Sequence, residues 1–350
     1  MRRRSVAVTW CAALALLGAT LGCSGGSDDD DPLAALGRAG LDPGSVTALV
    51  GRAAHDPGEG APVAQYFNLR RLRTGAGLAD DLEGEELVEE AFLDEMADGT
   101  PAEPYSALIR LALEEPGVLP LSRVAATYTD LTVPGSVLLG DWDPEAVAEA
   151  YAEVVGPVEE EQADGYRVLR AADEAPEGDD GGSGDPVATR VYSEAAVALS
   201  SDGAEVVFGA EGDGLGALAD DEEDTALALP GVDEVAAALD AAAVYTAALF
   251  LDVGSVGGEG PLPEPWSTGA VATGFDDEAG STAYAVLWHE DDAAAEANAE
   301  ALAEELEATD RCREPASTTV DGSLLVGSCA FDGRWVSEVV GRYPLGPLFS

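Results

Sequence analysis

The residue types that usually carry catalysis are scarce in this sequence, or they lack the spacing that catalysis needs. Only two histidines occur, His55 and His289, so a metal site built from several histidines cannot form. The run from His289 to Asp292 lacks the second histidine of a His-Glu-x-x-His zinc motif. No Gly-x-Ser-x-Gly elbow and no phosphate-binding glycine loop between a strand and a helix is present. We therefore predict no catalytic residues, and we expect His289 to cap a helix or lie on the surface.

Carboxylates are so numerous that no pair of them singles out a site. The chain has 68 Asp and Glu residues, and any two of them could in principle do acid–base chemistry. Acid-rich loops at 28–31, 173–185 and 220–224 are the best candidates for calcium. A segment beginning at Asp179 imitates an EF-hand loop, but Arg190 stands where the bidentate Glu should be. We expect diffuse cation association, with no specific metal site and no cofactor.

The four cysteines divide into two near the N-terminus and two near the C-terminus. Cys312 and Cys329 are an even pair with sixteen residues between them, a spacing unlike the Cys-x-x-Cys of redox and metal motifs. In an oxidising compartment such a pair predicts one disulfide. Closing this loop adds about 3 kcal/mol of stability by constraining the unfolded chain.

The N-terminus has the layout of an export signal. A basic start, Met1 to Arg4, precedes an uncharged apolar run from Val6 to Leu21, too short to favour a membrane-spanning helix. The segment 19–23, Ala-Thr-Leu-Gly-Cys, resembles a bacterial lipobox, although Thr20 stands where that motif usually has Leu. The resemblance implies cleavage before Cys23, which takes the lipid. The Gly-, Ser- and Asp-rich residues that follow predict a flexible tether.

Other interpretations of the N-terminus remain open. The signal could be cleaved without lipidation, leaving Cys23 a bystander, or it could stay as an anchor. Arg3 and Arg4 could also begin a twin-arginine signal. Together with the lipobox, the bias toward Ala, Asp, Glu and Arg and the segment 140–147 resemble uncharacterised exported lipoproteins of high-GC actinobacteria. This resemblance implies export and membrane attachment, and no activity.

The charge of the chain restricts its partners. The full sequence has 17 basic and 68 acidic side chains, a net charge of −51. Loss of residues 1–22 removes three arginines, and 14 basic against 68 acidic groups gives −54 for the mature chain. Nucleic acid and anionic lipid headgroups would repel such a polyanion, so we expect membrane attachment through Cys23 alone. A salty exterior or a high-GC codon bias could account for this composition.

Hydrophobic periodicity predicts a mixture of helices and strands. Asp143 and Pro144 form a strong helix start, because an acidic N-cap precedes a proline at the first helical position. Helices are predicted over 69–77, 85–96, 105–113, 143–155, 232–239 and 291–308, and strands over 63–68, 124–133, 136–139, 166–171, 188–199, 205–208, 244–253, 269–275, 281–288, 317–320, 324–331 and 335–340.

The order of these elements predicts an α+β fold. Its two loosely similar units, 46–210 and 211–350, would follow a signal peptide at 1–22 and a tether at 23–45. Each unit is expected to be an antiparallel sheet with its helices packed on one face.

The function predicted from the sequence is binding or scaffolding at the cell envelope, without catalysis. The alternative is a solute-binding protein or a carboxylate-dependent hydrolase with a cleft between the two units. The protein or small-molecule partner is not identified. Trp266 could stack a sugar or peptide, although packing is favoured for it and for Trp142, Trp288 and Trp335. Arg70, Arg71 and Arg73, the one basic cluster, are expected to pair with the Glu-rich stretch 83–90 rather than to bind an anion.

Overall fold

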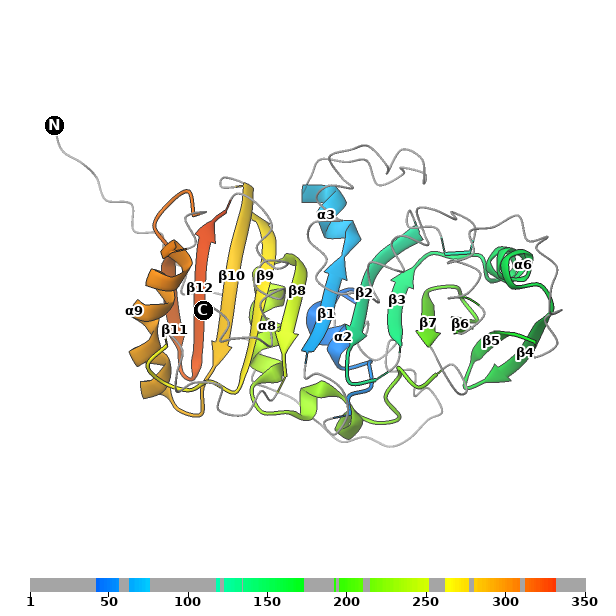
Figure 1. Cartoon of the computed structure of the whole chain (residues 1–350), viewed down its shortest axis with the longest axis horizontal. Helices are drawn as coiled ribbons and strands as arrows, with labels where there is room; N and C mark the ends of the chain where they lie inside the picture. The colour runs from blue at the N-terminus through cyan, green and yellow to red at the C-terminus, as the bar shows by residue number, and fades with distance from the viewer. Residues whose placement is uncertain are drawn as a thin grey trace, which may run out of the picture.

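One antiparallel sheet of 12 strands organises the described part of the chain (Figure 1). The strand order is β11-β12-β10-β9-β8-β1-β2-β3-β7-β6-β5-β4. This computed structural model describes residues 42–56, 63–75, 118–119, 123–133, 135–172, 192, 195–209, 215–251, 262–276, 280–308 and 312–331.

The strands are short and most neighbours in the sheet are also neighbours in sequence. Their bounds are β1 Val63–Asn68, β2 Val124–Asp130, β3 Ser136–Gly140, β4 Val158–Ala163, β5 Tyr166–Ala171, β6 Ala196–Ser200, β7 Glu205–Gly209, β8 Val244–Phe250, β9 Thr268–Asp276, β10 Gly280–Trp288, β11 Ser317–Asp321 and β12 Leu324–Ala330. The mixed α+β class predicted from the sequence is confirmed, with the sheet as the dominant element.

The described helices are α2 Val46–Val50, α3 Leu69–Gly75, α6 Pro144–Val155, α8 Val232–Ala241 and α9 Asp292–Ala308, with short 3₁₀ turns at Glu222–Asp224 and Ala226–Ala228. The start predicted for α6 is confirmed, because Asp143 caps it by accepting from the backbone N–H groups of Glu145 and Ala146. The N-terminus of α2 is capped twice, by Ser45 within its own segment and by Asp240 of α8. Asp240 therefore fixes α2 against α8.

Strands β1 and β8 lie at the centre and join the two halves of the chain. They pair antiparallel, with Gln65 opposite Ala248. The segments 46–210 and 211–350 consequently contribute to one continuous sheet.

The prediction that helices pack on one face of the sheet is wrong. On β8, Ala247 and Leu249 pack in the same cluster as α8, whereas Ala248 and Phe250 pack with α9. Successive strand residues point to opposite faces, so these two helices cover opposite faces. Every residue of β8 is buried, which is typical of a strand covered on both sides. In Figure 1, α9 and α6 lie at the two ends of the sheet.

The edge strand β4 was not predicted. Its sequence, VEEEQA, has little β propensity and is mostly exposed. It pairs with β5, where Arg167 bonds Glu160 and Arg170 bonds Glu161. Three consecutive glutamates also discourage another strand from adding to this edge.

Most predicted elements that fall on described residues are present, within a few residues at their ends. Cys312 and Cys329 form the predicted disulfide, which ties the segment after α9 to β12. The predicted helices at 85–96 and 105–113, the strand at 335–340, the signal peptide and most of the tether lie outside the described residues.

A candidate ligand-binding cleft

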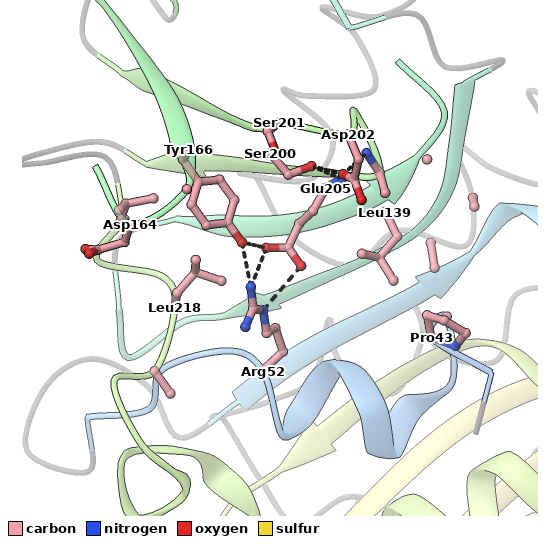
Figure 2. Close-up of a pocket in the computed structure, with 18 of the residues that line it drawn as sticks. Pro43, Arg52, Leu139, Asp164, Tyr166, Ser200, Ser201, Asp202, Glu205 and Leu218 are labelled. Carbon is pink, nitrogen blue, oxygen red and sulfur yellow. Dashed lines mark hydrogen bonds and ion pairs between the residues drawn. The ribbon is translucent and has the colours of Figure 1, made fainter. Parts of the chain in front are cut away.

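An open cleft of about 890 Å³ is the candidate site (Figure 2). Its wall comes from the ends of β3, β5, β6 and β7, from the turn that precedes α2 and from residues 215–220. Apolar contact surface is supplied by Pro43, Leu139 and Leu218, which Figure 2 shows around a polar centre. A volume of this size suits a small-molecule site.

The floor of the cleft is a buried group of three side chains. Arg52 places Nε 3.3 Å from Glu205 Oε2 and Nη2 3.2 Å from Glu205 Oε1. Tyr166 donates its hydroxyl to Glu205 Oε1 and accepts from Arg52 Nη2. The Glu205 side chain is 0% exposed and that of Arg52 is 11% exposed. The Glu205 carboxylate therefore accepts three hydrogen bonds and carries a charge balanced by Arg52.

Local turns put these residues in place. Asp164 and Gly165 join β4 to β5 with φ angles of 48° and 85°, the left-handed conformation of a two-residue hairpin turn. Tyr166 follows directly as the first residue of β5. At the other hairpin, Ser200 donates to Asp202 and accepts from the backbone N–H of Glu205, which orients the start of β7.

Arg52 reaches the floor because α2 ends just before it. The backbone N–H groups of Gly51 and Arg52 bond to carbonyl groups of α2, and the Arg52 carbonyl accepts from Ala219. Asp240 holds the other end of α2 at 2.7 and 3.0 Å from its first backbone nitrogens. The position of the Arg52 guanidinium is therefore fixed by contacts at both ends of α2.

Burial and charge shift the pKa values of Arg52 and Tyr166. Burial acts to lower the pKa of Arg52, but the ion pair and hydrogen bonds with Glu205 outweigh it, so the pKa is raised. Burial, followed by the negative charge of Glu205, raises the pKa of Tyr166 well above its usual value. Tyr166 thus stays a proton donor and Arg52 stays charged. Arg52 Nη1 has no hydrogen-bond partner among the described residues, and in Figure 2 it lies on the side away from Glu205.

The mouth of the cleft is acidic. The charged groups there are four carboxylates and one guanidinium, those of Asp42, Asp164, Asp202, Asp220 and Arg70. Their formal charge sums to −3, and the Arg52–Glu205 pair adds no net charge. The Ala204 backbone N–H and the Ser200 hydroxyl lower the pKa of Asp202, because both donate to its Oδ1.

The described lining residues provide polar and apolar surface but no serine paired with an imidazole. No histidine is among the described lining residues, so Ser200 and Ser201 have no imidazole base beside them. Glu205 is occupied by Arg52 and Tyr166, which leaves it unavailable as a general base. Nor do three or more His, Cys, Asp or Glu side chains gather as a metal site in the described ranges.

The structure tests several sequence predictions about individual residues. His289 is fully buried, not on the surface, and its Nε2 accepts from Asn298 of α9. The packing role favoured for Trp266 is confirmed, because its side chain is 4% exposed and packs against Phe250. The described cleft is lined mostly by residues of the first half, and Leu215, Leu218, Ala219 and Asp220 of the second half complete its wall.

The basic cluster divides between two roles. Arg71 donates to the Val244 carbonyl and lies 3.9 Å from Asp240, whereas Arg70 lines the mouth of the cleft. The expected partner stretch at 83–90 is outside the described residues. His55, for which the sequence indicated no role, lies 2.8 Å from the buried carboxylate of Asp130.

No protein-family model matches the chain, and neither the curated proteins nor the solved structures contain a significant match. Within the described ranges, no helix is long and apolar enough to cross a membrane.

Proposed function

We propose that this protein is an extracytoplasmic lipoprotein whose folded part binds a small molecule without transforming it. The observation that carries the binding role is the cleft of about 890 Å³ with a hydrogen-bonded, charge-balanced floor. Binding sites of this kind combine an apolar wall with a few oriented polar groups. The absence of a nucleophile paired with a base among the described lining residues favours binding over catalysis.

The anchor is proposed from the sequence. Lipid on Cys23 would hold the chain at the outer face of the membrane, and the tether at 23–45 would let the cleft stand clear of the lipid surface. Mass spectrometry of the membrane fraction should find a diacylglyceryl group on Cys23. Release of the Cys23→Ser variant into the medium is expected; soluble protein in both strains would contradict the anchor.

The two halves are proposed to be related units, 46–210 and 211–350. Both run from a helix through a strand and a pair of adjacent antiparallel strands to a helix, as α2-β1-α3-β2-β3-α6 and as α8-β8-β9-β10-α9, and α3 is the additional element of the first half. The antiparallel pairing of β1 with β8 supports a twofold relationship between them. In this arrangement the second unit serves as the platform against which α2 is held by Asp240.

Binding in the cleft can be tested with three small probes of similar size: phenethylamine, 2-phenylethanol and 3-phenylpropionate. Saturation-transfer NMR should detect binding of at least one probe to the wild type. Ala204 lines the cleft with an exposed side chain, so Ala204→Trp should fill it and abolish that signal. Ala297 is exposed on α9, and Ala297→Trp is the matched control that should leave binding intact. Equal binding to both variants would place the site elsewhere.

A further inference from the structure

The charges around the cleft are predominantly negative, while the Arg52–Glu205 pair at its floor has no net charge. The carboxylates of Asp42, Asp202 and Asp220 lie at the mouth, with Arg70 as the one cation beside them among the described lining residues. The Arg52 charge is balanced by Glu205 within hydrogen-bonding distance. An anionic ligand would therefore meet uncompensated negative charge at the mouth and no net positive charge below it.

The carboxylates keep acceptor capacity for a ligand. Oδ1 of Asp202 accepts from Ser200 and from the Ala204 N–H, and Oδ1 of Asp42 accepts from the Gly44 N–H, which leaves lone pairs on both carboxylates. Asp220 makes no hydrogen bond or ion pair with the described residues. Oxygens of this kind can accept charge-assisted hydrogen bonds from an ammonium group.

The rest of the cleft is shaped for an organic body rather than for a bare ion. Leu139 and Leu218 form apolar wall, and no group of three or more acidic or other metal-binding side chains converges among the described residues. Arg52 Nη1 adds a donor for a hydroxyl or carbonyl oxygen. We infer that the ligand of this cleft is a small organic cation, a protonated amine on an apolar body; this rests on the proposed binding role.

The net charge of −51 acts in the same direction over a longer range. A strongly negative chain raises the local concentration of cations and accelerates their association. The apolar wall then selects organic amines from inorganic cations.

The three probes separate this inference from the binding role, since they differ mainly in the charge of one group. Phenethylamine should bind most tightly and should lose its affinity in Ala204→Trp. Asp220→Asn should weaken the affinity for phenethylamine about five-fold. This corresponds to about 1 kcal/mol, the interaction of two unit charges about 4 Å apart in a high dielectric. Asp321 is exposed on β11 at the far end of the sheet, and Asp321→Asn is the control with the same net charge.

Each outcome has a distinct meaning. Preferential, Asp220-dependent binding of the amine supports the inference. Equal or tighter binding of 3-phenylpropionate or 2-phenylethanol in the same cleft overturns the ligand class and leaves the binding role standing. If Asp321→Asn weakens the amine as much as Asp220→Asn, the effect is one of total charge and the cleft carboxylates are not the recognition groups. Binding of none of the three overturns both proposals.

Discussion

Removing the charge of Glu205 should destabilise the protein far more than removing the charge of a surface glutamate. In Glu205→Gln the shape is kept, but the buried Arg52 guanidinium loses the carboxylate 3.2 to 3.3 Å away. Leaving a buried charge unpaired costs about 3 to 5 kcal/mol. Because a little of Arg52 remains exposed, we expect about 3 kcal/mol, a roughly 150-fold fall in the folding equilibrium constant. Urea unfolding followed by tryptophan fluorescence measures this difference.

The matched control is Glu160→Gln. Glu160 lies 2.9 Å from Arg167 at a similar ion-pair distance, but its side chain is 49% exposed. Exposed pairs contribute about 0 to 1 kcal/mol, so this variant should unfold close to the wild type. A double variant, Arg52→Met with Glu205→Gln, removes both charges and keeps an amide oxygen that can accept from the Tyr166 hydroxyl; it should recover most of the loss. If Glu205→Gln costs no more than Glu160→Gln, the floor of the cleft is solvated and the reasoning from burial fails.

Three further predictions concern other contacts. Replacing Cys312 and Cys329 by Ser should lower the free energy of unfolding by about 3 kcal/mol, measured by urea unfolding; reductant should then have no further effect on the variant. Burial lowers the pKa of His289, so the unfolded state binds the proton more readily than the folded state. The free energy of unfolding should therefore fall as the pH drops below the ordinary histidine pKa of 6.5. His289→Gln should flatten this pH dependence, and an unchanged pH profile in the variant would contradict the reasoning. Asp240→Ala removes two hydrogen bonds to the start of α2 and should cost about 1 to 2 kcal/mol in the same unfolding assay; a loss under about 0.5 kcal/mol would show that Ser45 caps the helix sufficiently alone.

The fold could be predicted from the sequence where local signals agree with the tertiary context. The Asp143-Pro144 helix start and the hairpin around residues 201–203 are of this kind, since capping and turn chemistry act over a few residues. Strand β4 was missed because three consecutive glutamates oppose strand propensity. Pairing with β5 and the hydrogen bond from Arg167 to Glu160 stabilise the strand conformation that the local sequence disfavours.

The sequence contains a signal that could have predicted helices on both faces of the sheet. The run from Val244 to Phe250 is apolar without alternation apart from Thr246, and such a run indicates burial on both faces. The single-face prediction relied on the helix pattern and gave this strand too little weight.

The candidate site had no comparable signal. Arg52 and Glu205 are 153 positions apart, and Tyr166 is 114 positions from Arg52. No local periodicity reports a contact over such distances, and in a chain with 68 acids nothing in the sequence singles out Glu205 as the partner. The disulfide was predictable because only two cysteines remain in the folded part. With a single possible pairing, the sequence predicts the bond without any knowledge of the distance between Cys312 and Cys329.

Salt should act in opposite directions on the fold and on the cleft. Raising NaCl from about 0.1 to about 1 M shortens the Debye length from about 10 to about 3 Å. That screens the repulsion among the excess acids, so the urea midpoint should rise. The buried Arg52–Glu205 pair is screened much less and should hold the floor unchanged. At the mouth, Asp202 and Asp220 are exposed, so phenethylamine affinity should fall over the same range. Affinity that rises together with the urea midpoint would mean that apolar contacts, not charge, select the ligand.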